Sequence, residues 1–232
     1  MKKFWKTVQV KENSINSYEI LLDDNILKTP LKKKLIISNA KIAEEIYKEW
    51  NQDTNLINTD DMIFYGIIST SIDKIYINRK LYIDDMLHFI DTDLICYRAE
   101  NPNDLAQWQS KNWDPIITKV EKYINNKINV FNGIMPVRQN KVIEHKITKF
   151  LTKFSDLEIA VMHRVTNITG SIFLALCVLK NDTIKKNIFE LSYLDELWQA
   201  KNWGYEEEAF KNRKKKNNEL NRIVYFLDCL KQ

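Results

Sequence analysis

The hydrophobic residues change their spacing within the stretch LIISNAKIAEEIYKEW, residues 35–50. Its first three residues are aliphatic and mostly β-branched, which predicts a short strand. Over residues 39–52, by contrast, Ile42, Ile46 and Trp50 recur four positions apart, the spacing of one face of a helix. The chain is therefore predicted to pass here from β structure to helical structure.

The residues before this change are predicted to form a small sheet. Strand-forming residues dominate FWKTVQV at 4–10 and YEILL at 18–22, because β-branched and aromatic side chains suit a pleated, half-buried surface. The acidic and amide residues at 23–25 predict a turn, since short polar side chains bond to their own backbone. A further strand at 26–28 is expected to end at Pro30, which cannot donate to a ladder.

The residues after a polar loop at 55–61 are predicted to be almost entirely helical. Only four glycines and four prolines occur among 232 residues, which argues against a loop-rich all-β fold. Asp114 followed by Pro115 predicts the start of a helix, and Gly170 interrupts an apolar one. The predicted helices span residues 64–77, 80–90, 104–112, 115–125, 142–153, 157–180, 183–202 and 206–230.

These patterns predict an α+β protein with two domains. The first, at residues 1–58, is expected to be a small β-rich domain that carries one helix. The second, at residues 59–232, is expected to be larger and all-helical. With 44% hydrophobic and 28% charged residues, the chain has an ordinary globular composition and enough length to bury a core.

Cysteine usage and the apolar stretches indicate where the protein works. Cys96, Cys177 and Cys229 are far apart, which suggests neither a disulfide framework nor a zinc site and favours a reducing compartment. From the pattern of the first residues, we expect neither a signal peptide nor a transit peptide. The most apolar stretch, at 168–179, is shorter than the ~20 residues that a membrane span needs. We expect a cytoplasmic protein without membrane insertion.

Catalytic patterns are sparse. The few scattered glycines form no phosphate-binding loop or dinucleotide fingerprint. Asp91 and Asp93, with a histidine, could in principle hold the metal of a metal-dependent hydrolase; the other interpretation is that one of them caps an element and pairs with Arg98. The three histidines lie in separate predicted helices without ligand-like spacing: His88, His145 and His163. We expect no cofactor, no metal and no enzymatic activity.

Nucleic-acid binding is a second alternative. The net charge is only +4, and the one dense basic run spans residues 213–216 within a predicted helix. A dedicated nucleic-acid-binding protein usually concentrates its charge in a larger patch. The run is therefore interpreted as a solvated helix face, with weak binding to nucleic acid kept as the alternative.

An acidic cluster near the C-terminus stands beside large aromatic residues. Trp203 and Tyr205 flank Gly204, which is expected to end one helix, and three glutamates at 206–208 open the next. Acidic side chains in a first helical turn complement the exposed N–H groups and the helix dipole. Glu206 fits that role best, which leaves Glu208 for contact with a partner, because exposed aromatic residues beside charge are typical of protein-binding surfaces.

Four blocks of residues, in this order along the chain, form one pattern. The central block is TDLICYRA at 92–99, followed by Pro102, Leu105, Gln109 and WDPI at 113–116. The other three are LKTP at 27–30 with Ala43, Glu49 and Trp50, then TGS at 169–171, then Asp195, Glu196, Gln199, Trp203, Gly204, Glu206, Glu208 and Ala209. Together they closely resemble the ATP-twelve family of F1-ATPase assembly chaperones, found in mitochondria and alphaproteobacteria.

The resemblance implies a β-rich N-terminal domain, a helical C-terminal domain and a chaperone function. It implies an alphaproteobacterial-type member that acts as a monomer on the free alpha subunit of the F1 head and shields the surface later covered by the beta subunit. Among the motif residues, Trp50, Asp93, Arg98 and Trp113 are expected to be structural. The residues expected to contact the partner are Glu196, Trp203, Tyr205, Glu206 and Glu208.

Overall fold

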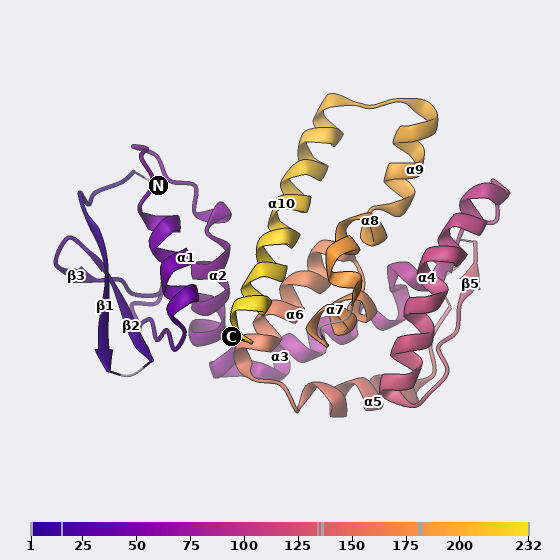
Figure 1. Ribbon diagram of the computed structural model, residues 1–232. Coiled ribbons are helices and arrows are strands. Elements are labelled where there is room, and N and C mark those ends of the chain that lie inside the picture. Colours follow the sequence, from indigo (N-terminus) through magenta and orange to yellow (C-terminus); the bar gives the residue numbers. More distant parts are fainter. Residues whose placement is uncertain (1, 15, 134, 136, 181–182, 232) are drawn as a thin grey trace. The chain divides into compact units, whose positions relative to one another are not determined.

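The computed structural model describes residues 2–14, 16–133, 135, 137–180 and 183–231, and Figure 1 shows the order of its elements. The chain divides into two compact units. The first unit consists of Met1–Arg79 and Arg222–Gln232, and the second of Lys80–Asn221. An antiparallel sheet near the N-terminus is followed by a mostly helical remainder, so the predicted α+β fold class is confirmed.

The sheet of the first unit is a three-stranded antiparallel one. It contains β1 (Val8–Ser14), β2 (Ser17–Leu22) and β3 (Asn25–Ile26) in that spatial order. The predicted turn between the last two strands is confirmed, because Asp23 takes a left-handed conformation with a φ of 52°. The chain reverses there and pairs Leu22 with Asn25.

Three of the predicted strands differ from the structure, among them the one at 26–28, which is β3 at Asn25–Ile26. The first begins at Val8 instead of Phe4, because the backbone N–H groups of Lys6 and Thr7 donate to the Asp23 carboxylate at 3.0 Å. A donor that is already used by a side chain cannot contribute to a ladder. The segment 35–37 pairs with the sheet only through an isolated bridge at Ile37.

Helix α1 (Ala40–Trp50) lies beside this sheet within the first unit (Figure 1). The Asn39 side chain caps it by accepting a hydrogen bond from the Ile42 N–H at 3.1 Å. The helix buries the predicted face, including Ile46. On the outer side Glu44 and Lys48 form the ion pair expected from their spacing, at 2.8 Å.

Glu49, one of the motif residues, connects α1 to the next helix. Its carboxylate accepts hydrogen bonds from the backbone N–H groups of Phe64 and Tyr65, at 2.8 and 2.9 Å, in the first turn of α2 (Ile63–Thr70). Arg222, from the end of α10 (Glu207–Cys229), donates to Glu49 at 3.2 Å and to Glu45 at 2.5 Å. Burial raises the pKa of Glu49, so these donors are what stabilises its charge.

Helix α2 continues into the next helix without a break in the helical path of the backbone. It continues through a π-helical turn at Ser71–Ile75 into α3 (Tyr76–Leu87), which has a non-helical residue at Asn78. The buried Asp73 within this turn accepts from the Thr29 hydroxyl at 2.7 Å and from the Leu31 N–H at 2.9 Å. The predicted helix at 64–77 is therefore anchored to the loop that follows the sheet.

The core of the second unit is built around α7 (Ile172–Leu179), every residue of which is buried. It packs against α6 (Asp156–Thr169) and α4 (Asn103–Ile124). The predicted helix at 157–180 is two helices, because Gly170 takes a left-handed φ of 66° that ends the first, and the Ser171 side chain caps the second. Helix α7 has no polar face because all of its sides are buried.

The prediction that a helix begins at Asp114 and Pro115 is wrong, since α4 runs through both residues as one helix. Pro115 removes one helical hydrogen bond, but the residue is exposed, and so is Lys111, whose carbonyl oxygen loses the bond. Both residues therefore lie on the solvent-exposed side of the helix. On the opposite face the buried Trp113 donates its indole N–H to the Leu191 carbonyl at 2.9 Å, which fixes the helix against the core.

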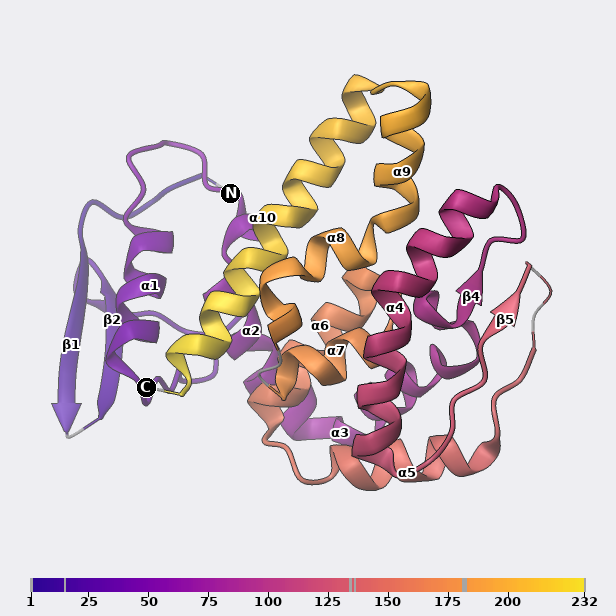
Figure 2. The same ribbon diagram turned by 45° about the vertical axis from the view of Figure 1, so that its right-hand side comes forward.

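The remaining elements of the second unit surround this core. Two short strands, β4 (Tyr97–Arg98) and β5 (Phe131–Asn132), pair in parallel, and Figure 2 shows them beside α4. The predicted helix at 183–202 consists of three pieces: a 3₁₀ turn at Thr183–Asn187, α8 (Ile188–Ser192) and α9 (Leu194–Trp203). Helix α5 (Lys141–Leu151) packs on α4.

None of the helices in the described part of the chain combines the length and apolar character that crossing a bilayer requires.

Candidate functional site

The buried Asp93 holds three elements of the second unit together. Its carboxylate accepts hydrogen bonds from the Ser171 hydroxyl at 2.6 Å, the Phe173 N–H at 3.1 Å and the Ile95 N–H at 3.2 Å. It therefore caps both the 3₁₀ helix Leu94–Cys96 and the start of α7. Burial raises the pKa of Asp93 to about 7, against the effect of these donors. The predicted capping role is confirmed.

The predicted pairing of this acid with Arg98 is wrong. The Arg98 guanidinium bonds to Asp114 at 2.9 Å and lies over the Trp113 ring, 4.9 Å from its centroid. Three residues from one sequence block thus form a cation-centred contact. These contacts hold α4 in position, which agrees with the structural role expected for Arg98 and Trp113.

The geometry gives no support to a metal-dependent hydrolase. The Asp91 carboxylate accepts a hydrogen bond from the Gln139 N–H at 2.8 Å, and Asp93 is enclosed as described. His163, in turn, pairs with Asp85 at 2.7 Å. Across the described residues, no three His, Cys, Asp or Glu side chains gather in a way that could hold a metal ion.

The basic run at 213–216 is only partly a solvated face. Arg213 is buried and lies 3.5 Å from Glu196 on α9. Lys216 lies 3.6 Å from Glu219, while Lys214 and Lys215 are exposed. Since two of its four cations are matched by carboxylates, the run does not form the concentrated patch that nucleic-acid binding needs.

Three aromatic side chains are exposed at the end of α9, in the connection to α10 and in the first turn of α10, and we call them the aromatic tip. The exposed fractions are 73% for Trp203, 70% for Tyr205 and 51% for Phe210. Gly204, with a φ of 96°, ends α9 and directs the chain into the connection. Figures 1 and 2 both show this connection lying far from α6 and α7 within the second unit. The tip is thus open to a partner.

Short-range packing gives the aromatic tip its order. The Trp203 ring meets Trp198 edge to face at 5.6 Å between centroids, and Tyr205 meets Phe210 in the same way at 6.4 Å. Trp198 is itself buried, so it provides a fixed base for Trp203. Phe210 was missed from sequence because an aromatic residue one turn into a helix usually faces the core; its neighbours in the acidic cluster were the available signal.

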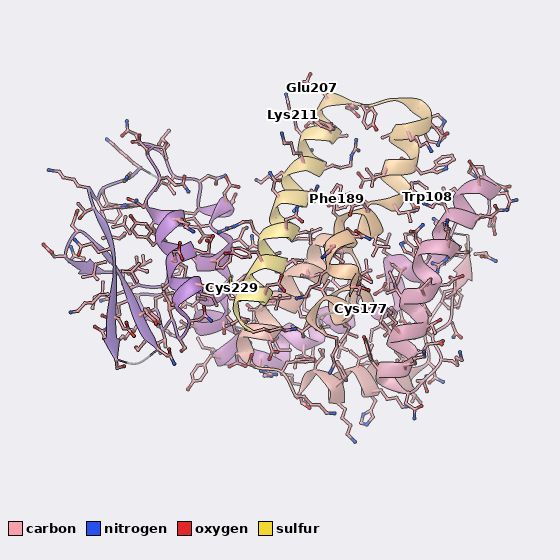
Figure 3. The ribbon with its side chains drawn as sticks, in the orientation of Figure 1. Trp108, Cys177, Phe189, Glu207, Lys211 and Cys229 are labelled. Carbon is pink, nitrogen blue, oxygen red and sulfur yellow. The ribbon has the colours of Figure 1, made fainter. Side chains whose placement is uncertain are left out.

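The acidic cluster precedes and opens α10. The prediction that Glu206 lies in the first helical turn is wrong by one residue: its carbonyl oxygen accepts from the Phe210 N–H at 2.9 Å, and the helix begins at Glu207. Glu207 and Glu208 occupy the first turn, where they complement the helix dipole. Figure 3 labels Glu207 and Lys211, which form an ion pair of 2.5 Å on successive turns.

Four of the five predicted contact residues lie together between the last residue of α9 and the first turn of α10, and all four are exposed. The fifth, Glu196, is exposed on α9, seven residues before Trp203 and beside Arg213. Seven residues correspond to about two helical turns, or roughly 10 Å. Glu196 therefore lies at the side of the tip instead of within it.

A cavity of about 510 Å³ in the second unit joins two of the motif blocks. The cavity is lined by Arg98, Glu100, Leu105 and Gln109 from the central block and its surroundings, and by Asp195 and Gln199 from α9. The Gln109 amide donates to Asp195 at 2.8 Å and accepts from the Ala99 N–H at 2.7 Å. Sequence reasoning named these motif residues but could not bring them together.

Comparison with known proteins agrees with this architecture. The family model "ATP12 chaperone protein" matches residues 2–121, more than half of the chain. "Protein ATP12, mitochondrial" of Saccharomyces cerevisiae is 22% identical across 89% of this chain and 77% of the yeast protein.

Two solved structures are similar over almost the whole chain. A putative chaperone from Agrobacterium tumefaciens has a TM-score of 0.88 at 29% identity, with 99% of this chain and 86% of that chain covered. Atp12 from Paracoccus denitrificans has a TM-score of 0.84 at 25% identity, with 98% and 97% covered. With the family match and the sequence resemblance, these findings show that the chain belongs to the ATP12 family of chaperones for assembly of the F1-ATPase.

Proposed function

We propose that this chaperone binds the free alpha subunit of the F1 head and shields the surface that the beta subunit later covers. It does so as a monomer, without ATP and without any catalytic step. An unassembled ring subunit exposes a large apolar patch, which is an aggregation hazard. Covering such a patch requires a complementary surface and no chemistry.

The observation that carries this proposal is the aromatic tip. Three large aromatic side chains, each more than half exposed, lie at one connection beside three glutamates. Tryptophan and tyrosine are the residues that most often anchor protein interfaces, because they bury a large area and lose little side-chain freedom. An exposed cluster of this kind is stabilised when a partner covers it.

The proposed contacts divide between apolar and charged groups. Trp203 and Tyr205 enter the apolar surface of the client, and Glu206 and Glu208 face basic groups at its edge. Complementary charge at the rim of an interface mainly sets orientation and association rate. Glu196 joins this rim on one side, since its 3.5 Å contact with Arg213 is long enough to be exchanged for a client cation.

A retention experiment with separately produced subunits tests this proposal. The chaperone is immobilised and offered alpha subunit, beta subunit or assembled F1 in parallel. We expect retention of alpha alone, because the shielded surface is absent from beta and covered in the assembled head. Adding ATP or a chelator should leave retention unchanged.

Two outcomes would overturn parts of the proposal separately. Retention of beta without alpha would show that the client is wrong. Release of bound alpha by ATP, with hydrolysis that follows the chaperone and not a contaminant, would show that the mechanism is wrong. Light scattering of heated alpha subunit, with and without the chaperone, measures the shielding itself.

A further inference from the structure

The cavity between β4, α4 and α9 is lined by more acidic than basic side chains, and the hydrogen bonds that stabilise the fold do not account for this excess. Among its lining residues are one cation, Arg98, and two acids, Glu100 and Asp195. The cation is buried and pairs with Asp114, which does not line the cavity, and its charge also acts on Asp195; the two acids still outnumber it. The cavity therefore presents a net negative charge to anything that enters it.

Asp195 is positioned to receive a donor. One of its oxygens, Oδ1, accepts from the Gln109 amide at 2.8 Å, and Gln109 is held in turn by the Ala99 N–H. Among the residues that the structure describes, Gln109 is the side chain that donates to this carboxylate, and it does so at Oδ1. Burial raises the pKa of Asp195, while the Gln109 hydrogen bond and the Arg98 charge oppose that rise.

Glu100 forms the second acidic wall. Gly133 lies next to it with a φ of 80°, and a Cβ atom on Gly133 would come within 2.9 Å of the Glu100 carboxylate oxygen. Glycine thus leaves the space that this carboxylate occupies at the cavity. Leu105 contributes an apolar surface to the same cavity.

We propose that this cavity binds a Lys or Arg side chain presented by the client, with its cationic head between Asp195 and Glu100 and its aliphatic stem on Leu105. The identity of the client rests on the proposed function, whereas the choice of a basic side chain rests on the cavity alone. Long basic side chains pack their methylene groups on apolar surface and extend their charge to carboxylates. Charge-assisted hydrogen bonds of this kind are among the stronger contacts in interfaces.

Other ligand classes fit the cavity less well. An anion would meet two carboxylates and a guanidinium already paired to Asp114. A bare metal ion would find too few ligands, since no group of three suitable side chains occurs within the described residues. A neutral apolar side chain would cover Asp195 Oδ2 without donating to it, which is costly for a partly buried acid.

The first test uses small probes and needs no client. N-acetyl-arginine N-methylamide, the lysine equivalent and the neutral norleucine equivalent are titrated separately into the isotope-labelled full chain. We expect the two basic probes, at about millimolar affinity, to shift the NMR signals of Gln109 and Gln199, and Asp195→Asn to abolish the shifts. Equal shifts with norleucine, or no shifts with any probe, would overturn the proposal.

The second test compares variants for retention of the alpha subunit. Asp195→Asn removes the charge but keeps the acceptor for Gln109, and Glu100→Gln changes an exposed residue. We expect affinity to fall roughly tenfold for the first and about threefold for the second, with unchanged melting temperatures. The exposed acid Glu144, changed to Gln, is the matched control and should leave affinity within about twofold.

The outcomes separate the two proposals. If the unmodified chain retains no alpha subunit but its cavity binds the basic probes, the proposed client fails and the cavity assignment stands. If alpha is retained equally by the unmodified chain, Asp195→Asn and Glu100→Gln, the cavity is not a client site. A loss of retention in Asp195→Asn that is matched by a lower melting temperature, with Glu100→Gln unaffected, would also overturn the cavity assignment.

Discussion

Asp93 and Trp203 of the aromatic tip belong to the same family resemblance but occupy opposite environments. Asp93 is fully buried, and three donors surround its carboxylate. Trp203 and Tyr205 are exposed by 73% and 70%. Residues that recur together in a family pattern are therefore not all explained by one kind of physical requirement.

The contrast indicates how a role can be assigned to a motif residue. A buried polar group with every partner inside its own unit stabilises the fold, because its hydrogen bonds replace those lost to water. An exposed aromatic group gains little from the folded chain alone, and most of its gain comes when another surface covers it. The comparison predicts that mutations in the two regions change different measurements.

The largest effect is expected for Asp93→Ala. It leaves the Ser171 hydroxyl and two backbone N–H groups buried without an acceptor, at about 1–3 kcal/mol each. We expect the free energy of unfolding to fall by roughly 4 kcal/mol at pH 6, as measured by urea denaturation. Asp91→Ala is the matched control, since that half-buried carboxylate accepts from Gln139, and it should cost about 1 kcal/mol. Equal losses in both variants would contradict the role given to Asp93.

The ionisation of Asp93 should make stability depend on pH. Its folded-state pKa of about 7 lies above the ordinary 3.8, so the folded protein holds the proton more tightly than the unfolded chain does. The stability that this proton provides is complete below about pH 4 and is lost as the pH rises through 7. Asp93→Asn lacks this titration. The stability advantage of the natural protein over Asp93→Asn should therefore shrink by roughly 3 kcal/mol between pH 5 and pH 8, and a constant difference would contradict it.

The aromatic tip should respond in the opposite way. Trp203→Ala is expected to weaken retention of the alpha subunit by about thirtyfold, or roughly 2 kcal/mol, as for an interface anchor. Its free energy of unfolding should change by less than about 0.5 kcal/mol. The buried Trp198 is the contrasting position, since Trp198→Ala should cost roughly 3 kcal/mol of stability. Tyr76→Ala, another exposed aromatic change, controls for stickiness and should retain alpha normally.

Structural features that depend on residues close together in the sequence were predictable from it. The turn at Asp23, the buried face of α1 and the ion pair of Glu44 with Lys48 all follow from short spacings and are present. The start signal at Asp114 and Pro115 failed for the opposite reason. Tertiary packing of Trp113 against Leu191 holds α4 together across a proline that local rules place at a helix start.

Contacts between distant residues were not predictable. Arg222 meets Glu45 across 177 residues, and Gln109 meets Asp195 across 86. No spacing rule applies at such separations. The aromatic tip, by contrast, is local, and the sequence therefore placed four of its proposed contacts in one connection. The cavity needed the folded chain, because its two walls come from different motif blocks.

The smallest effects are expected for the glutamates beside the tip, and they refine its boundary. Glu208→Lys places a cation in the first turn of α10, which should cost about 0.3–1 kcal/mol of stability through the helix dipole. Glu206 precedes the helix, so Glu206→Lys should cost less than about 0.5 kcal/mol.

If both face basic groups of the client, each reversal should weaken retention by about tenfold, because like charges then meet at the rim. Glu12→Lys, an exposed reversal on β1, changes the net charge equally and should leave retention intact. Raising the salt concentration should reduce the difference between the tip variants and this control, since rim charges are screened. Normal retention by Glu206→Lys and Glu208→Lys together would confine the contact to the aromatic side chains. A loss in Glu12→Lys as large as in the tip variants would mean that net charge, and not position, governs retention.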